Sequence, residues 1–231
     1  MNPSSQLAMF LRRTARTFGI NGLIANLWSR GGYEDRFGPA LEAEIRHGDI
    51  VWDIGANVGL YTTIFLERAG ATGKVVAFEP TSACFSQLSA QCGKSSNAIL
   101  INAAMGEADG LISMVINSDP MAATHQVVTS ADTTQRSVNV QVRSADSFCG
   151  ERPELIPTVI KIDVEGHEGS VLDGMHNVLS NPKLRCVGIE IHFGLLDERN
   201  ESHRPRQIEA TLKKHLFQPR WTDPSHILAT R

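Results

Sequence analysis

The sequence lacks a C-x-x-C pair, and its four cysteines are scattered through apolar or helical context. Scattered thiols of this kind are typical of reduced, buried side chains in a reducing compartment. The sequence also lacks a strong charge of either sign, because its formal net charge at pH 7 is -3. So small a charge gives no reason to expect a polyanionic partner. We therefore predict that nucleic acid is not a partner.

The sequence also lacks a long apolar run near its start. Arg12, Arg13 and Arg16 interrupt the apolar stretches before a signal-peptide core or a membrane span is complete. Export is not expected, and a cytoplasmic location is predicted. The same arginines, beside apolar residues, could form a basic amphipathic helix on a membrane or a partner. We favour the alternative, in which one or two leading helices cover a sheet edge without membrane association.

The chain of 231 residues, with 42% hydrophobic and 20% charged residues, has the size and composition of one globular domain. From residue 49 onward, apolar runs of strand length alternate with stretches of helical period. This alternation predicts an α/β fold in which crossover helices join mostly parallel strands. We expect the domain to span residues 46–231 and to follow an N-terminal helical extension over residues 1–45.

The expected strands and helices define a doubly wound sheet. Strands are predicted over 50–54, 74–78, 98–102, 159–164 and 185–192, and helices over 60–68, 82–92, 166–179 and 205–216. Two short runs, 219–222 and 226–230, predict a closing antiparallel hairpin, which makes the sheet seven-stranded and mostly parallel. Two alternating runs, one after residue 106 and one over 138–143, predict a peripheral pair of β segments. Residues 118–136 between them are poor in bulky apolar residues and predict a mobile loop.

A glycine-rich turn follows the first predicted strand, where Asp53, Gly55, Asn57 and Gly59 form the pattern D-x-G-x-N-x-G. Glycines at this spacing let the backbone approach a ligand where any Cβ would collide, and asparagine tolerates a left-handed conformation. The dinucleotide-binding fingerprint G-x-G-x-x-G is absent, because Asn57 stands at the middle glycine. The turn therefore favours a nucleotide cofactor other than NAD(P).

Polar side chains end each of the five predicted parallel strands, at the edge where open α/β sheets bind ligands. Unpaired carboxylates would be costly in a dry core. Glu79 ends the second strand, and its two acceptor oxygens suit both hydroxyls of a ribose. The alternative for Glu79 is a helix-capping or ion-paired carboxylate. The other strand ends carry Asp53, Asn102, Asp163, Glu165, Glu190 and His192.

Four motifs together give the chain a specific resemblance. They are D-x-G-A-N-x-G at residues 53–59, F-E-P at 78–80, N-A-A-x-G at 102–106 and K-x-D-x-E-G-x-E at 161–168. From about residue 50 to its end, the chain resembles the FkbM family of methyltransferases. One departure is the loop at residues 119–128, which lacks the small Gly/Ser cluster that family members often carry. Contacts with the methyl acceptor are therefore the least transferable part of the resemblance.

The resemblance implies a class I, Rossmann-like methyltransferase fold and S-adenosylmethionine as the cofactor. It also implies O-methylation of a sugar or secondary metabolite. Asp53 is expected to meet the amino-acid end of the cofactor, directly or through water, and Glu79 to bind the ribose. The residues expected to bind the cofactor are Asp53, Gly55, Asn57, Gly59, Glu79, Asn102, Ala103 and Asp163. No oligomeric state follows from the sequence.

Strand alternation predicts a second polar group. Lys161 and Asp163 lie on one side of the fourth strand, and Glu190 and His192 share a side of the fifth, so adjacent strands would bring them together. An acceptor hydroxyl needs a base, and His192 is the first choice because its ordinary pKa lies near neutral pH. The catalytic group is completed by Asp163, Glu165 and Lys161. The alternatives are a buried ion-pair network around Lys161 and a hydrogen-bonded strand-end histidine at His192.

Other interpretations stay open. A divalent cation suits imidazole and carboxylate groups, and the candidates are Asp163, Glu165, His167, Glu190 and His192. Their spacing fixes no coordination shell, so no metal ligands are assigned. His125, in the predicted mobile loop, could reach the acceptor. The rival functions are an NAD(P)-dependent oxidoreductase, which would need the missing fingerprint, and a catalytically silent cofactor- or partner-binding module, which would not need the polar ends of strands four and five.

Overall fold

The computed structural model describes residues 36–115, 126–127 and 137–231. Most of the N-terminal extension predicted for residues 1–45 lies outside the described residues, and its division from the domain stays a prediction. The predicted mobile loop, including His125, also lies outside them, apart from residues 126–127.

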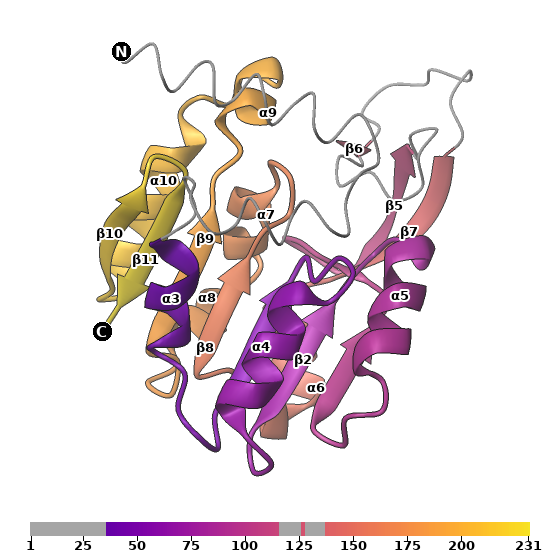
Figure 1. Cartoon of the computed structure of the whole chain (residues 1–231). Helices are drawn as coiled ribbons and strands as arrows, with labels where there is room; N and C mark the ends of the chain where they lie inside the picture. Colours follow the sequence, from indigo (N-terminus) through magenta and orange to yellow (C-terminus); the bar gives the residue numbers. More distant parts are fainter. Residues whose placement is uncertain (1–35, 116–125, 128–136) are drawn as a thin grey trace. The chain divides into compact units, whose positions relative to one another are not determined.

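A seven-stranded sheet forms the centre of the described unit, with the strand order β10-β11-β9-β8-β1-β2-β3 (Figure 1). Neighbouring strands are parallel except at β11, which is antiparallel to both β9 and β10. The strands are β1 (Ile50–Ile54), β2 (Lys74–Phe78), β3 (Ala98–Ile101), β8 (Val159–Ile162), β9 (Cys186–Glu190), β10 (Gln218–Asp223) and β11 (His226–Thr230). The predicted sheet with its closing antiparallel hairpin is confirmed.

Alternating apolar side chains attach helices to both faces of this sheet. In β1, Val51 packs into the core of one face, whereas Trp52 and Ile54 pack into the core of the other. The first face carries α3 (Phe37–Glu42), α4 (Leu60–Ala69) and α5 (Ser82–Cys92). The second carries α6 (Ala145–Glu151), α7 (Glu168–Asp173), α8 (His176–Ser180) and α10 (Arg204–Lys214). Figure 1 shows α3 and α4 in front of the sheet.

Helix α3 lies within the predicted N-terminal extension and packs on the sheet. Phe37 and Leu41 are buried, and a Cβ added at Gly188 of β9 would stand 2.9 Å from the Phe37 ring. The glycine therefore lets the helix approach the strand closely. The Phe37 ring also stacks on the His226 imidazole of β11, with 4.4 Å between their centroids. Phe37 and Leu41 thus pack into the core on one face of the sheet.

A second sheet is built from segments between β3 and β8, in the order β4-β7-β5-β6. Its strands are β4 (Ala104–Met105), β5 (Gly110–Val115), β6 (Gln126–Val127) and β7 (Ser137–Arg143). Strands β5 and β7 pair antiparallel, which confirms the predicted peripheral pair. The two-residue strands β4 and β6 were too short to leave a sequence pattern.

The helix predicted over residues 166–179 is two helices, α7 and α8, divided at Gly174. A Cβ at Gly174 would stand 2.0 Å from the carbonyl oxygen of Gly106, so the chain meets another backbone where the helix breaks. The Asp146 carboxylate then accepts hydrogen bonds from the amides of Asn177 and Val178 at the start of α8. The single long helix of the prediction was therefore wrong, because tertiary contacts end it.

Strands β8 and β9 end earlier than predicted, at Ile162 and Glu190. Asp163 and His192 therefore lie in the connections beyond the strands. His192 directly precedes the helix α9 (Phe193–Glu198). The sequence predicted neither α9 nor α6, nor the 3-10 turn η1 (Pro153–Leu155). Among the residues that the structure describes, no helix combines the length and apolar character needed to cross a membrane.

Candidate active site

The glycine turn lies where the strand order reverses. Strand β1 pairs with β2 on one side and with β8 on the other, and such a switch point is where open α/β sheets bind ligands. Gly55 has a φ of +83°, and a Cβ there would stand 1.8 Å from the carbonyl oxygen of Asp163. The glycine is therefore required for the turn after β1 to meet the end of β8. Gly59, with a φ of +95°, likewise packs against Leu88 of α5.

Glu79 ties the turn to the end of β2. Its Oε2 accepts a hydrogen bond of 2.9 Å from the amide of Asn57, which is left-handed with a φ of +52°. Its Oε1 accepts from the amide and hydroxyl of Thr81 at 2.8 and 2.6 Å. The side-chain amide of Asn102 donates hydrogen bonds to the backbone carbonyl oxygens of Glu79 and Pro80 at 2.8 and 3.1 Å. Three predicted cofactor residues from three strand ends thus meet here, with the buried Ala103 beside Asn102.

Asp53 and Lys161 lie beneath this surface. Asp53 is fully buried, and its carboxylate accepts a hydrogen bond of 2.7 Å from the Thr62 hydroxyl. The Lys161 ammonium lies 3.5 Å from Asp53 and 3.3 Å from Asp163. Burial opposes its charge, but the carboxylates of Asp163 and Asp53 raise the pKa of Lys161 well above its usual range. Lys161 is therefore a permanent cation that links the ends of β1 and β8.

Replacing Lys161 by methionine is expected to lower the free energy of unfolding by about 3–5 kcal/mol, because the buried Asp53 loses its cation. Urea denaturation followed by circular dichroism measures this loss. The double variant Lys161→Met/Asp53→Asn should recover part of it, because no charge is then left buried alone. A single variant as stable as the wild type would contradict the pairing.

His192 stands among carboxylates at the ends of β8 and β9. Its Nε2 lies 3.2 Å from Glu165, 3.7 Å from Asp163 and 3.9 Å from Glu190. Its Nδ1 lies 2.7 Å from Oε1 of Glu168, a fully buried carboxylate. Glu168 was not predicted as a site residue, although it closes the K-x-D-x-E-G-x-E motif and so had a signal in the sequence.

The carboxylates change the protonation of His192. Burial disfavours the charged imidazole, but the hydrogen bond to Glu168 and the charges of Glu165 and Asp163 outweigh it and raise the pKa of His192 to about 9. The imidazole is therefore protonated near neutral pH, where it has no lone pair for a proton from an acceptor. Lys161, Asp163, Glu190 and His192 lie close together, as predicted. The raised pKa of His192 nevertheless disfavours this residue as the base.

Comparison with known proteins adds to this geometry. The methyltransferase FkbM domain matches residues 53–219. The chain belongs to the FkbM methyltransferase family. A relative from Haloferax volcanii, the hexuronic acid methyltransferase AglP, is 33% identical to this FkbM chain over 160 residues, which cover 67% of this chain and 61% of the relative. The chain thus spans less than two thirds of that relative's length.

Solved structures also resemble this FkbM-family chain. An FkbM methyltransferase from Methylobacillus flagellatus is 18% identical with a TM-score of 0.49, covering 79% of this chain and 43% of that one. A protein from Clostridium thermocellum, described as a proposed rRNA methylase, is 9% identical with a TM-score of 0.50, covering 84% and 92%. At this identity, the second likeness shows the fold alone. The family match confirms that the chain has a methyltransferase domain, of a class whose cofactor is S-adenosylmethionine.

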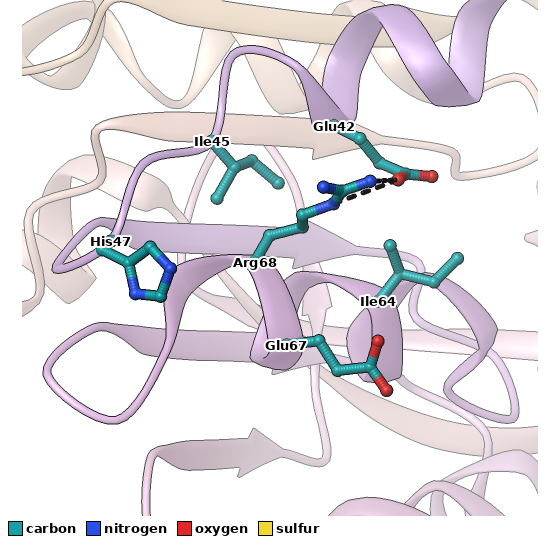
Figure 2. Close-up of a pocket in the computed structure, with 6 residues that line it drawn as sticks. All are labelled: Glu42, Ile45, His47, Ile64, Glu67 and Arg68. Atoms are coloured by element: carbon teal, nitrogen blue, oxygen red, sulfur yellow. Dashed lines mark hydrogen bonds and ion pairs between the residues drawn. The ribbon is translucent and has the colours of Figure 1, made fainter.

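Two further candidates of the FkbM-family chain are His167 and Glu190. His167 is mostly buried, and burial together with the charge of Arg199 lowers its pKa to about 4. Glu190 also contacts His226, at 3.5 Å. A surface pocket lies at the amino ends of the strands and contains none of the predicted site residues (Figure 2). It is lined by Glu42, Ile45, His47, Ile64, Glu67 and Arg68.

Proposed function

We propose that this protein transfers a methyl group from S-adenosylmethionine to a hydroxyl group of a sugar or secondary metabolite. The observation that carries the proposal is the contact between the turn at Gly55 and the backbone of Asp163. It sets the group expected to bind the cofactor directly beside a cluster of proton-accepting side chains. A sugar acceptor is supported by the relative that bears the name hexuronic acid methyltransferase.

The residues at the ends of β1 to β3 suit the cofactor. Glu79 would bind the ribose through Oε2, because Oε1 already accepts two hydrogen bonds, from the amide and the hydroxyl of Thr81. The turn beside this carboxylate is left-handed at Gly55, Asn57 and Gly59. Asp53 would act on the amino-acid end of the cofactor through its neighbours, because it is itself fully buried. Asn102 and Ala103 would border the nucleoside.

The sulfonium of the cofactor supplies an activated methyl group, so the protein must mainly position the acceptor in line with it. Asp163 and Glu165 can accept the proton of an acceptor hydroxyl. Protonated His192 holds both carboxylates within 4 Å, and Lys161 holds Asp163 from the other side. We therefore assign the base to a carboxylate, and positioning to His192 and Lys161.

Replacing His192 by glutamine is expected to lower kcat/KM about a hundredfold, because a displacement of about 1 Å in the groups around the reacting atoms costs that much. A methyl-transfer assay with labelled cofactor measures it. The control is His203→Gln, which removes an exposed imidazole outside the cluster and should leave turnover unchanged. Equal turnover of His192→Gln and wild type would remove His192 from the mechanism.

Calorimetry with S-adenosylmethionine and with NADH tests the function itself. We expect binding of S-adenosylmethionine only, and binding of NADH alone would support the oxidoreductase instead. A screen of sugars, uronic acids and secondary metabolites for methyl transfer then tests the acceptor class. Binding of the cofactor with no transfer to any small molecule would support the catalytically silent module. A small-molecule acceptor, the absence of a nucleic-acid partner and a cytoplasmic location stay predictions.

A further inference from the structure

Three donor atoms converge beyond the ends of β8 and β9. One atom each from Asp163, Glu165 and His192 lies within 4.8 Å of the other two. The Nε2 atom of His192 is 3.2 Å from Oε2 of Glu165 and 3.7 Å from Oδ1 of Asp163. Two ligands bound at about 2.1 Å to one metal ion, at about 90–110° to each other, stand about 3.0–3.5 Å apart. The distance from His192 to Glu165 lies in this range, and the distance from His192 to Asp163 exceeds it by about 0.2 Å, which a small rotation of the partly exposed Asp163 side chain would close.

The orientation of His192 supports the same interpretation. Its Nδ1 contacts Oε1 of the fully buried Glu168, which also accepts a hydrogen bond of 2.8 Å from the amide of Gly166. Its Nε2 is buried, faces Glu165 and Asp163, and makes no hydrogen bond to any described residue. In metal sites, a carboxylate commonly holds one imidazole nitrogen in this way, which directs the lone pair of the other to the metal.

The charge around this point favours a cation. Lys161 contacts Asp163, and His226 contacts both Glu190 and Asp223. Carboxylates nevertheless outnumber cations in the cluster, even with both imidazoles protonated. The carboxylates are Asp53, Asp163, Glu165, Glu168, Glu190 and Asp223, and the cations are Lys161, His192 and His226. A divalent ion would replace the proton on His192 and neutralise more of this excess.

We propose that Asp163, Glu165 and His192 bind one divalent first-row metal ion, with Mn²⁺ as the best match. One imidazole nitrogen with two carboxylate oxygens suits such an ion better than the all-oxygen shell that Mg²⁺ and Ca²⁺ prefer. Three protein ligands leave positions open for oxygen atoms of another molecule. The next step rests on the proposed function: oxygens of the sugar acceptor bind at these positions, and the metal ion lowers the pKa of the acceptor hydroxyl.

Electron paramagnetic resonance of the full chain, titrated with Mn²⁺ alone and with added S-adenosylmethionine, tests the site. We expect one bound ion per chain and a pulsed spectrum with modulation from one imidazole nitrogen. His192→Gln should weaken binding at least tenfold and remove that modulation. Glu165→Gln should weaken binding similarly and keep it. The control Glu198→Gln removes an exposed carboxylate of α9 and should change the Kd less than twofold.

Two results would overturn the site: no bound Mn²⁺ under either condition in the folded wild type, or bound Mn²⁺ whose nitrogen modulation survives in His192→Gln. Circular dichroism establishes that each variant is folded. Cofactor binding by calorimetry and a methyl-transfer assay, both on chelator-treated protein, distinguish failure of this proposal from failure of the proposed function. Cofactor binding and methyl transfer without any bound Mn²⁺ would refute only the part of the proposal in which the ion binds the acceptor. A bound Mn²⁺ without cofactor binding would refute the proposed function alone.

Discussion

Replacing Glu79 by alanine is expected to lower the affinity for S-adenosylmethionine about a hundredfold. Hydrogen bonds to a charged group contribute about 1.5–3 kcal/mol, and about 1.4 kcal/mol corresponds to a factor of ten. The variant loses the acceptor for the ribose and also the hydrogen bond that holds the amide of Asn57 in the turn. Isothermal calorimetry with the purified variant measures the Kd directly.

A control is needed for the hydrogen bonds that Glu79 makes with Thr81. Thr81→Val removes the hydroxyl that donates to Glu79 but keeps the carboxylate and its bond to Asn57. We expect the Kd of this control to stay within about threefold of the wild-type value, because it loses one hydrogen bond outside the ribose contact. If Glu79→Ala bound as tightly as the wild type, or if both variants lost affinity equally, the ribose role would be refuted.

Replacing Gly55 by alanine is expected to lower the free energy of unfolding by about 4 kcal/mol. A left-handed residue with a Cβ costs about 1–2 kcal/mol, and forcing atoms into a packed site costs about 1–3 kcal/mol more. The new Cβ would stand 1.8 Å from the carbonyl oxygen of Asp163, a backbone atom that no side-chain rotation can move away. Urea denaturation gives the loss, and calorimetry should show cofactor affinity falling with it.

Gly150 offers a matched control for this substitution. A Cβ added there, in α6, meets no atom within 4 Å, and Gly150 has no positive φ. Gly150→Ala should therefore be neutral or stabilise by up to about 1 kcal/mol, because alanine favours a helix and restricts the unfolded chain. A loss below about 1 kcal/mol in Gly55→Ala would mean that the ends of β1 and β8 separate easily, against the packing described above.

The bounds of β1 and β2 followed from local pattern, because each is a short apolar run that ends at a polar residue and a turn. The family and its cofactor followed from motifs within single loops. The local sequence pattern gave wrong element bounds where contacts with distant residues end a helix. The break at Gly174 depends on the backbone of Gly106, far away in the sequence, and no helical period records such a contact.

The candidate site divides in the same way. Strand ends identified Glu79, Asp163 and His192, because parallel strands bring their carboxyl ends to one edge. The partner of His192 could not be derived by alternation, because Glu168 lies in α7 and meets the imidazole only through the left-handed turn at Glu165 and Gly166. The raised pKa of His192 depends on that meeting, and so the fold changes the property for which His192 was predicted as the base, its ordinary pKa near neutral pH.

The contact between Gly55 and Asp163 limits how this enzyme can be redesigned. A protein engineer who wants a new acceptor would normally diversify the residues nearest the reacting hydroxyl. Here any library that shifts the backbone of Asp163 also pushes on the turn expected to hold the cofactor, since no side chain separates them. Variants selected for a new substrate at this position should often lose cofactor affinity. Diversification is better directed to the peripheral strands β5 and β7, which pair with neither β1 nor β8.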